Sequence, residues 1–398
     1  MKSVRSLQRV LLYSHDTYGL GHLRRNLSIA HELLRLPSPP RVVLASGSPA
    51  IGRVPLPSGL ATVVLPPVTK TPQGDYRPLD GSLGISLVRR ARSAVVLDVV
   101  SRWKPDVMLV DHAPHGMKGE LLPVFDHIGR TRSATLLALG LRDILDESSR
   151  VIDTWTADGV YATLEDVYDS VMVYGERDMF DVADLYGLSA EMADRIEYCG
   201  YVTTPAPQSV PLPPEIPDGK PFVLAMIGGG GDGVQLLIDT ALAAKSIRIA
   251  CVLCTGPLMS AGDRQRLLDT TGHLEDVYTV EHLAEPAAVA ARAAAVVSRG
   301  GYNSLCELVG LGVPTIVVPR RAPRLEQLMR AHAFARRGLV EVVEESVDLA
   351  SALPRLLGGA STSWSGAGLD LGGAARTVAH LCRLVADIDP RSLACIPA

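Results

Sequence analysis

The segment from Ser298 to Leu308 carries residue types that bind the phosphates and ribose of a nucleotide. It reads Ser-Arg-Gly-Gly-Tyr-Asn-Ser-Leu-Cys-Glu-Leu and follows an apolar, strand-like run. Paired glycines before a helix expose backbone amides at its positive end, which suits a diphosphate. Glu307 lies about two turns into that helix, where a carboxylate can accept two ribose hydroxyls. A lone helical glutamate is more often a solvated charge, but the spacing from the glycines favours the ribose.

A second glycine-rich turn, Gly228 to Gly233, also stands between a predicted strand and a predicted helix. Its bare amides, including those of Gly229 and Gly230, can hold phosphate oxygens without obstruction by side chains. The turn is not a Walker loop, because no Gly-Lys-Ser/Thr follows it. A tight strand-to-helix turn is the alternative interpretation, although five glycines exceed what such a turn needs.

The N-terminal turn places a histidine at the start of a predicted helix. The pair Gly19 and Gly21 lacks the third glycine of a dinucleotide fingerprint, since Arg24 stands there, so NAD binding is disfavoured. Gly21 lets a ligand approach backbone amides, and His22 can accept a proton from an acceptor hydroxyl. A histidine that only hydrogen-bonds the loop is an equal alternative. His15 and Asp16 are weaker candidates for the same role.

Two further polar segments follow predicted strands of the first half. Asp111-His112-Ala113-Pro114-His115 ends one strand, where open α/β sheets bind ligands. We expect a catalytic-site or acceptor-side role here, with plain loop structure as the alternative, and the spacing of the histidines argues only weakly for a metal. Arg142 and Asp143, also after a strand, are possible acceptor contacts.

The predicted elements that position the candidate site residues are apolar runs that alternate with helical segments. This alternation is typical of parallel α/β sheets. With 398 residues the chain is long enough for two domains at roughly 150 residues each. We predict an α/β protein of two tandem Rossmann-like domains facing each other across a cleft. Six prolines mark the stretch Thr203–Lys220 as a linker. The expected boundaries are a first domain at 1–202, a linker at 203–220, a second domain at 221–373 and a C-terminal helix at 374–398 that packs back on the first domain.

Composition excludes several classes of partner. The formal net charge is −4, so electrostatic attraction to nucleic acid is not expected. No apolar run approaches the ~18 residues of a membrane span, and no signal peptide is evident, so we expect a cytoplasmic protein. Peripheral membrane contact stays open: Arg89, Arg90 and Arg92 could touch anionic lipid, although a solvated helix face is the simpler explanation.

The second half resembles a known family. The Ser298–Leu308 segment, then Gly-Leu-Gly-Val-Pro-Thr-Ile-Val-Val-Pro, then Glu326-Gln327, resembles the donor-binding signature of GT-B glycosyltransferases. The most similar branch contains the peptidoglycan lipid-intermediate N-acetylglucosaminyltransferase. The segment Gly19–His22 of this sequence also resembles the glycine-rich N-terminal loop of that branch. The sequence departs from the pattern in having fewer glycines in that loop and an unusually basic Pro319–Arg324 segment. Those arginines either neutralise donor phosphates or an anionic acceptor, or form a solvated loop.

The resemblance implies a role for each matching residue. Glu307 would hold the ribose, Glu326 and Gln327 would contact the transferred sugar, and the backbone near Leu283 would read the base. The donor diphosphate would be surrounded by Ser298, Gly300, Gly301, Asn303 and Ser304. Arg299 and the helix beginning near Asn303 would stabilise charge on the leaving group.

We therefore expect a metal-independent, inverting glycosyltransferase that needs no cofactor beyond its nucleotide-sugar substrate. It would move a hexose or N-acetylhexosamine, from a donor expected to be UDP-linked, to a hydroxyl acceptor. His22, or with less support Asp111, would be the base. The alternatives are an epimerase, which turns over without an acceptor, and a catalytically silent nucleotide-sugar binding protein. Fold resemblance does not separate these three.

Overall fold

The computed structural model describes residues 6–15, 21–52, 54–71, 75–203, 212, 216, 219–229, 231–283, 285–358 and 368–387. Backbone contacts divide the chain into two compact units, Met1–Thr203 with Gly372–Ala398, and Thr204–Leu371. The predicted α/β architecture with parallel sheets in two domains is confirmed. Most of the expected proline-rich linker lies outside the described residues.

The first unit is built on a seven-stranded parallel sheet in the order β3-β2-β1-β6-β7-β8-β9. Its strands are β1 Arg9–Ser14, β2 Arg41–Ser46, β3 Leu60–Val64, β6 Val107–Asp111, β7 Leu136–Arg142, β8 Ser170–Tyr174 and β9 Ile196–Tyr198. The central strands are continuous runs of buried residues, as parallel strands covered on both faces must be. A short antiparallel pair, β4 Val68–Lys70 and β5 Tyr76–Pro78, stands apart from this sheet.

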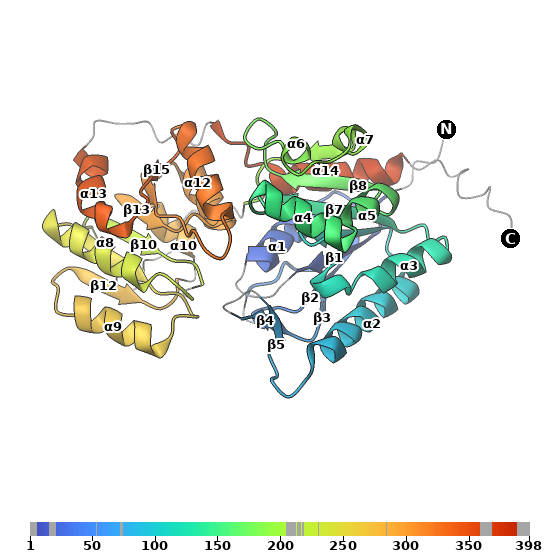
Figure 1. Cartoon of the computed structure of the whole chain (residues 1–398), viewed down its shortest axis with the longest axis horizontal. Coiled ribbons are helices and arrows are strands. Elements are labelled where there is room, and N and C mark those ends of the chain that lie inside the picture. The colour runs from blue at the N-terminus through green and yellow to red at the C-terminus, as the bar shows by residue number, and fades with distance from the viewer. Residues whose placement is uncertain are drawn as a thin grey trace. The chain divides into compact units, whose positions relative to one another are not determined.

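Helices cover both faces of the first sheet (Figure 1). They are α1 Gly21–Leu34, α2 Ile85–Trp103, α3 Leu122–Arg130, α4 Ser148–Asp158, α5 Val160–Asp166, α6 Val182–Leu185, α7 Ala190–Asp194 and α14 Gly373–Ala386, with the 3-10 turn η1 at Met117–Gly119. The C-terminal helix α14 packs against α1 and β8, so it belongs to the first unit although it follows the second in the chain.

The second unit repeats this plan with a six-stranded parallel sheet in the order β12-β11-β10-β13-β14-β15. Its strands are β10 Phe222–Met226, β11 Ala250–Cys254, β12 Val277–Val280, β13 Ala295–Ser298, β14 Thr315–Val317 and β15 Glu341–Val342. Its helices are α8 Val234–Ser246, α9 Ala261–Thr271, α10 Pro286–Ala290, α11 Tyr302–Leu311, α12 Glu326–Arg336 and α13 Leu349–Gly358, with the 3-10 turn η2 at Ser346–Asp348. Among the described residues, no helix combines the length and apolarity needed to span a membrane.

Candidate functional site

In each sheet the strand order reverses beside the first strand of the unit. In the first unit this point lies between β1 and β6, and in the second between β10 and β13. Open α/β sheets bind ligands at the carboxyl ends of the strands at such a point, because the loops there diverge to opposite sides. Tyr13 is paired with Val110 in one sheet and Met226 with Ser298 in the other, so the polar segments that follow these strands begin side by side.

At this point of the first unit, His22 and Arg25 of α1 converge on Asp111. His22 Nδ1 lies 2.6 Å from Asp111 Oδ2, while Arg25 Nε and Nη2 donate to Oδ1 at 2.9 and 2.7 Å. The Arg25 and Asp111 side chains are 1% and 2% exposed, and that of His22 is 17% exposed. Arg25 Nη2 also lies 3.0 Å from His22 Nδ1, but the contact of that nitrogen with Asp111 is shorter. Because a carboxylate only accepts hydrogen bonds, we place the proton of His22 on Nδ1 and the lone pair on Nε2.

Burial and the neighbouring charges together set the protonation states of His22 and Asp111. Burial lowers the pKa of His22 to about 4, more than the neighbouring Asp111 raises it. Burial acts to raise the pKa of Asp111, but Arg25 and then His22 outweigh it and hold that pKa at about 2. At neutral pH the cluster is therefore a neutral imidazole oriented by an ionised carboxylate. That arrangement can take a proton from a bound hydroxyl.

Two more histidines stand beside His22. The His15 and His112 rings lie 5.8 and 5.2 Å from the His22 ring, measured between centroids. Arg142 Nη2 lies 3.1 Å from His112 Nε2, and since arginine only donates, that nitrogen accepts and the proton of the neutral ring sits on Nδ1. His112 Nδ1 is buried without a partner among the described residues. Burial also lowers the pKa of both histidines.

The structure thus brings together the predicted first-half residues His22, Asp111, His112 and Arg142. Gly21 opens α1 directly before His22. Gly19 lies outside the described residues. Arg25 was not predicted as a site residue, although its spacing of three from His22 places both on one face of the helix. Within the described residues, no group of three or more histidine, cysteine, aspartate or glutamate side chains is placed to hold a metal ion.

For Arg92 both sequence-based alternatives, the solvated helix face and the lipid contact, are wrong. Its side chain is fully buried and donates from Nε to Glu120 at 2.6 Å, while the Tyr13 hydroxyl donates to the same carboxylate. Arg89 and Arg90 are exposed on α2. Of the three arginines, only these two face solvent.

In the second unit, glycine turns open two helices at the reversal point. Gly228 and Gly229 follow β10, and Gly230 lies outside the described residues. Helices α8 and α11 begin after Gly233 and Gly301, and neither cap glycine supplies a side-chain hydrogen bond to its helix. The positive end of the α11 dipole therefore lies at this glycine turn, where Asn303 and Ser304 stand.

Gly300 shows why this turn needs glycine. Its φ is +79°, and a Cβ there would lie 2.7 Å from Val317 Cγ1. A side chain would therefore be strained by the backbone conformation and would clash with β14. Ser298, buried at the end of β13, accepts a long 3.5 Å hydrogen bond from the Gly300 amide.

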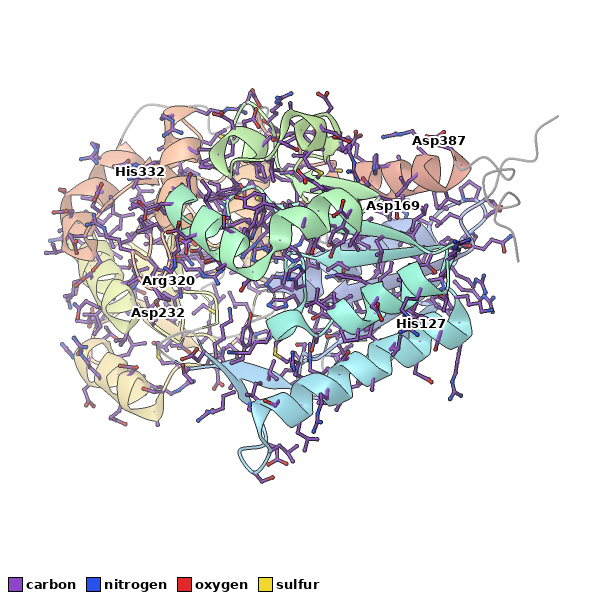
Figure 2. All side chains as sticks on the ribbon, turned by 45° about the vertical axis from the view of Figure 1, so that its right-hand side comes forward. His127, Asp169, Asp232, Arg320, His332 and Asp387 are labelled. Atoms are coloured by element: carbon purple, nitrogen blue, oxygen red, sulfur yellow. The ribbon has the colours of Figure 1, made fainter. Side chains whose placement is uncertain are left out.

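Charged side chains gather at the same edge of the second sheet. Arg299 follows β13 and Arg320 follows β14, and the Arg320 amide donates to Gln327 Oε1 at 3.3 Å. Glu326 opens α12 with its side chain 9% exposed. Asp232, in the turn before α8, lies beside Arg320 (Figure 2). Asp232 was not among the predicted donor-binding residues. Arg320 belongs to the basic Pro319–Arg324 segment, for which neutralisation of the donor phosphates was one of the predicted alternatives.

Two further predicted donor contacts, Glu307 and Leu283, differ from each other in burial. Glu307 lies partly buried in the second turn of α11. Leu283 follows β12, and its side chain is 1% exposed and packs in the hydrophobic core. Any contact of Leu283 with a ligand must therefore come from its backbone.

Residues 225–357, which hold both glycine turns of the second unit from β10 to α13, match the glycosyltransferase family 28 C-terminal domain. The protein is a glycosyltransferase. The glycosyltransferase has the GT-B fold, as solved structures also indicate. No curated protein sequence matches it significantly.

Three solved structures illustrate the shared fold. A glycosyltransferase of kitacinnamycin superposes with a TM-score of 0.60 at 17% identity, covering 96% of this chain and 100% of the other. TcCGT1 in complex with UDP gives 0.60 at 17% identity, covering 94% of each chain. The UDP-GlcNAc 2-epimerase of Neisseria meningitidis bound to UDP-GlcNAc gives 0.61 at 12%, covering 94% and 99%. At such identities the likeness shows the fold alone, and the predicted N-acetylglucosaminyltransferase branch stays a prediction.

Proposed function

We propose that this glycosyltransferase moves a hexosyl or N-acetylhexosaminyl group from a UDP-linked sugar to a hydroxyl acceptor, with inversion at the anomeric carbon. The observation that carries the proposal is the 2.6 Å bond between His22 Nδ1 and Asp111 Oδ2. It leaves the basic Nε2 of a neutral imidazole available at the ligand-binding edge of the first sheet. Support for UDP comes from the similar fold of proteins solved with UDP or UDP-GlcNAc.

The proposed reaction is a single displacement. The acceptor oxygen forms a bond to the anomeric carbon as the bond from that carbon to the diphosphate breaks, and the electron pair leaves with the nucleoside diphosphate. His22 Nε2 takes the acceptor proton, and Asp111 stabilises the resulting imidazolium. One displacement inverts the anomeric centre.

The second unit would hold the donor. The N-terminal end of α11 and the neighbouring arginines would stabilise the negative charge that develops on the diphosphate. In this proposal that charge needs no metal ion. Glu307 would accept hydrogen bonds from the ribose, and Glu326 and Gln327 would contact the transferred sugar. Acceptor contacts would come from Gly21, His112 and Arg142.

Thermal unfolding against a panel of nucleoside diphosphates and nucleotide sugars, in EDTA, tests the donor site. We expect one nucleotide series to raise the melting temperature of the wild type and not of Glu307→Ala. Incubation of the best donor with hydroxyl acceptors should then give a product of inverted configuration, resolved by NMR. Turnover of the donor without any acceptor would favour epimerisation instead. Tight donor binding with no product under any acceptor would favour a silent binding protein.

A further inference from the structure

One cluster of charged side chains in the second unit is paired but not hydrogen-bonded. Arg320 stands between two carboxylates: its Nη1 lies 3.8 Å from Asp232 Oδ2, and its Nη2 lies 3.6 Å from Glu326 Oε1. Both distances exceed a hydrogen bond. Figure 2 shows Asp232 and Arg320 close together. Arg320 is thus shared between the glycine turn before α8 and the first residue of α12.

Three buried polar atoms of this cluster have no hydrogen-bond partner among the described residues. They are Nε of Arg299, Nε of Arg320 and Oε2 of Glu326. The Glu326 side chain is only 9% exposed, so solvent does not easily supply the missing bonds. Because an unsatisfied buried polar group is costly, a native protein that keeps several together is set up to receive a ligand that satisfies them.

The unsatisfied atoms define the chemistry of that ligand. Two guanidinium N–H groups require acceptors, and the Glu326 oxygen requires a donor. The two arginines are also close enough to repel: burial and Arg320 lower the pKa of Arg299, while Asp232 raises it. A group with anionic oxygens beside hydroxyls, which is the diphosphate and sugar of a nucleotide sugar, meets all three requirements.

We propose that Arg320 binds the donor diphosphate, and that Asp232 and Glu326 pair with it while no donor is bound. This inference rests on the function proposed above. When the donor binds, its diphosphate replaces Asp232 as the partner of Arg320 and bonds Arg299. Glu326 then no longer pairs with Arg320, and its carboxylate accepts a hydrogen bond from a sugar hydroxyl. Bond breaking leaves an additional negative charge on the departing nucleoside diphosphate, so Arg320 binds the product side of the reaction more strongly than the intact donor.

Isothermal titration of the purified protein with a nucleoside and its diphosphate tests this assignment. We expect Arg320→Ala to weaken diphosphate binding about tenfold or more, the value of one charge-assisted hydrogen bond, and to leave nucleoside binding unchanged. Asp232→Asn should act in the opposite direction and tighten diphosphate binding by up to about fivefold, the scale of a partly exposed ion pair. Because the two variants move affinity in opposite directions, loss of folding cannot imitate the result.

Arg321→Ala is the matched control. Arg321 is the next residue of the same loop, carries the same charge and pairs instead with Glu344 and Glu345. Equal weakening in Arg320→Ala and Arg321→Ala would overturn the proposal, since only general charge would then matter, and so would weakening in Asp232→Asn. A wild type that binds no nucleoside diphosphate would overturn the proposed function and this inference with it.

Discussion

Replacement of His22 by alanine should abolish most of the transfer activity without loss of donor binding. The variant removes Nε2, the atom that we expect to take the acceptor proton. General bases contribute about 10²- to 10⁴-fold to enzymatic rates. At about 1.4 kcal/mol per factor of ten, this is roughly 3 to 5 kcal/mol of barrier, and it should appear in kcat/KM for the acceptor.

The structure predicts that this variant keeps its fold. Arg25 donates two hydrogen bonds to Asp111 without the help of His22, so the buried charges stay paired. The loss of one hydrogen bond to a carboxylate costs about 1.5 to 3 kcal/mol of stability. Asp111→Asn is the poorer experiment, because it would leave Arg25, 1% exposed, without its carboxylate at a cost of about 3 to 5 kcal/mol.

Release of nucleoside diphosphate, followed over a series of alcohols and phenols, measures the effect. The loss should be smaller for phenols, since a more acidic hydroxyl needs less help from a base. His31→Ala, an exposed histidine in the last turn of the same helix, is the control. Retention of activity within about tenfold for every acceptor would refute the assignment of His22 as base. A loss fully explained by weaker donor binding would refute it as well.

Three further predictions concern pH and the buried charges. Because the pKa of His22 is lowered to about 4, kcat/KM should stay level as the pH falls through 6.5 and decline only near 4; a decline centred at 6.5 would contradict the depressed value. Burial lowers the pKa values of His15 and His112 as well, so the unfolded chain binds protons before the native state does, and the free energy of unfolding in urea should be smaller at about pH 5.5 than at about pH 7.5. Glu120→Gln leaves the fully buried Arg92 without a counter-ion and should lower the free energy of unfolding by about 3 to 5 kcal/mol; a loss below about 1 kcal/mol would show that the pair is dispensable.

The architecture could be predicted because its signals are local. Strands such as Val107–Asp111 are apolar up to their last residue, and helices such as Gly21–Leu34 show a helical period, so their alternation indicates parallel sheets before any contact is known. The carboxyl-end rule then places Asp111 and Arg142 at one edge of a sheet. Short elements gave weaker signals: β15 has two residues and β9 has three, too few for a pattern to repeat.

The wrong prediction for Arg92 has a physical reason. Three arginines close together suggest a basic surface when only charge is considered. The helical period contained the opposite signal, because Val88, Arg92, Val96 and Val100 stand four residues apart and form one buried stripe. A local pattern does not reveal the ion-pair partner that a buried arginine such as Arg92 requires. Glu120 lies 28 residues further along the chain and meets Arg92 only in the folded unit.

The two charged clusters differ in a way that fits the different tasks proposed for them. The Asp111 carboxylate accepts hydrogen bonds of 2.6 to 2.9 Å from His22 and Arg25, so the position of His22 is fixed before a substrate arrives. Around Arg320 the ion pairs are 3.6 and 3.8 Å long, and neighbouring polar atoms lack hydrogen-bond partners in the part of the chain that the structure describes. A base must be oriented in advance to transfer a proton efficiently. If the polar groups around Arg320 were fully hydrogen-bonded to one another, those bonds would have to break before a diphosphate could bind. Incomplete pairing at Arg320 therefore favours binding of the diphosphate.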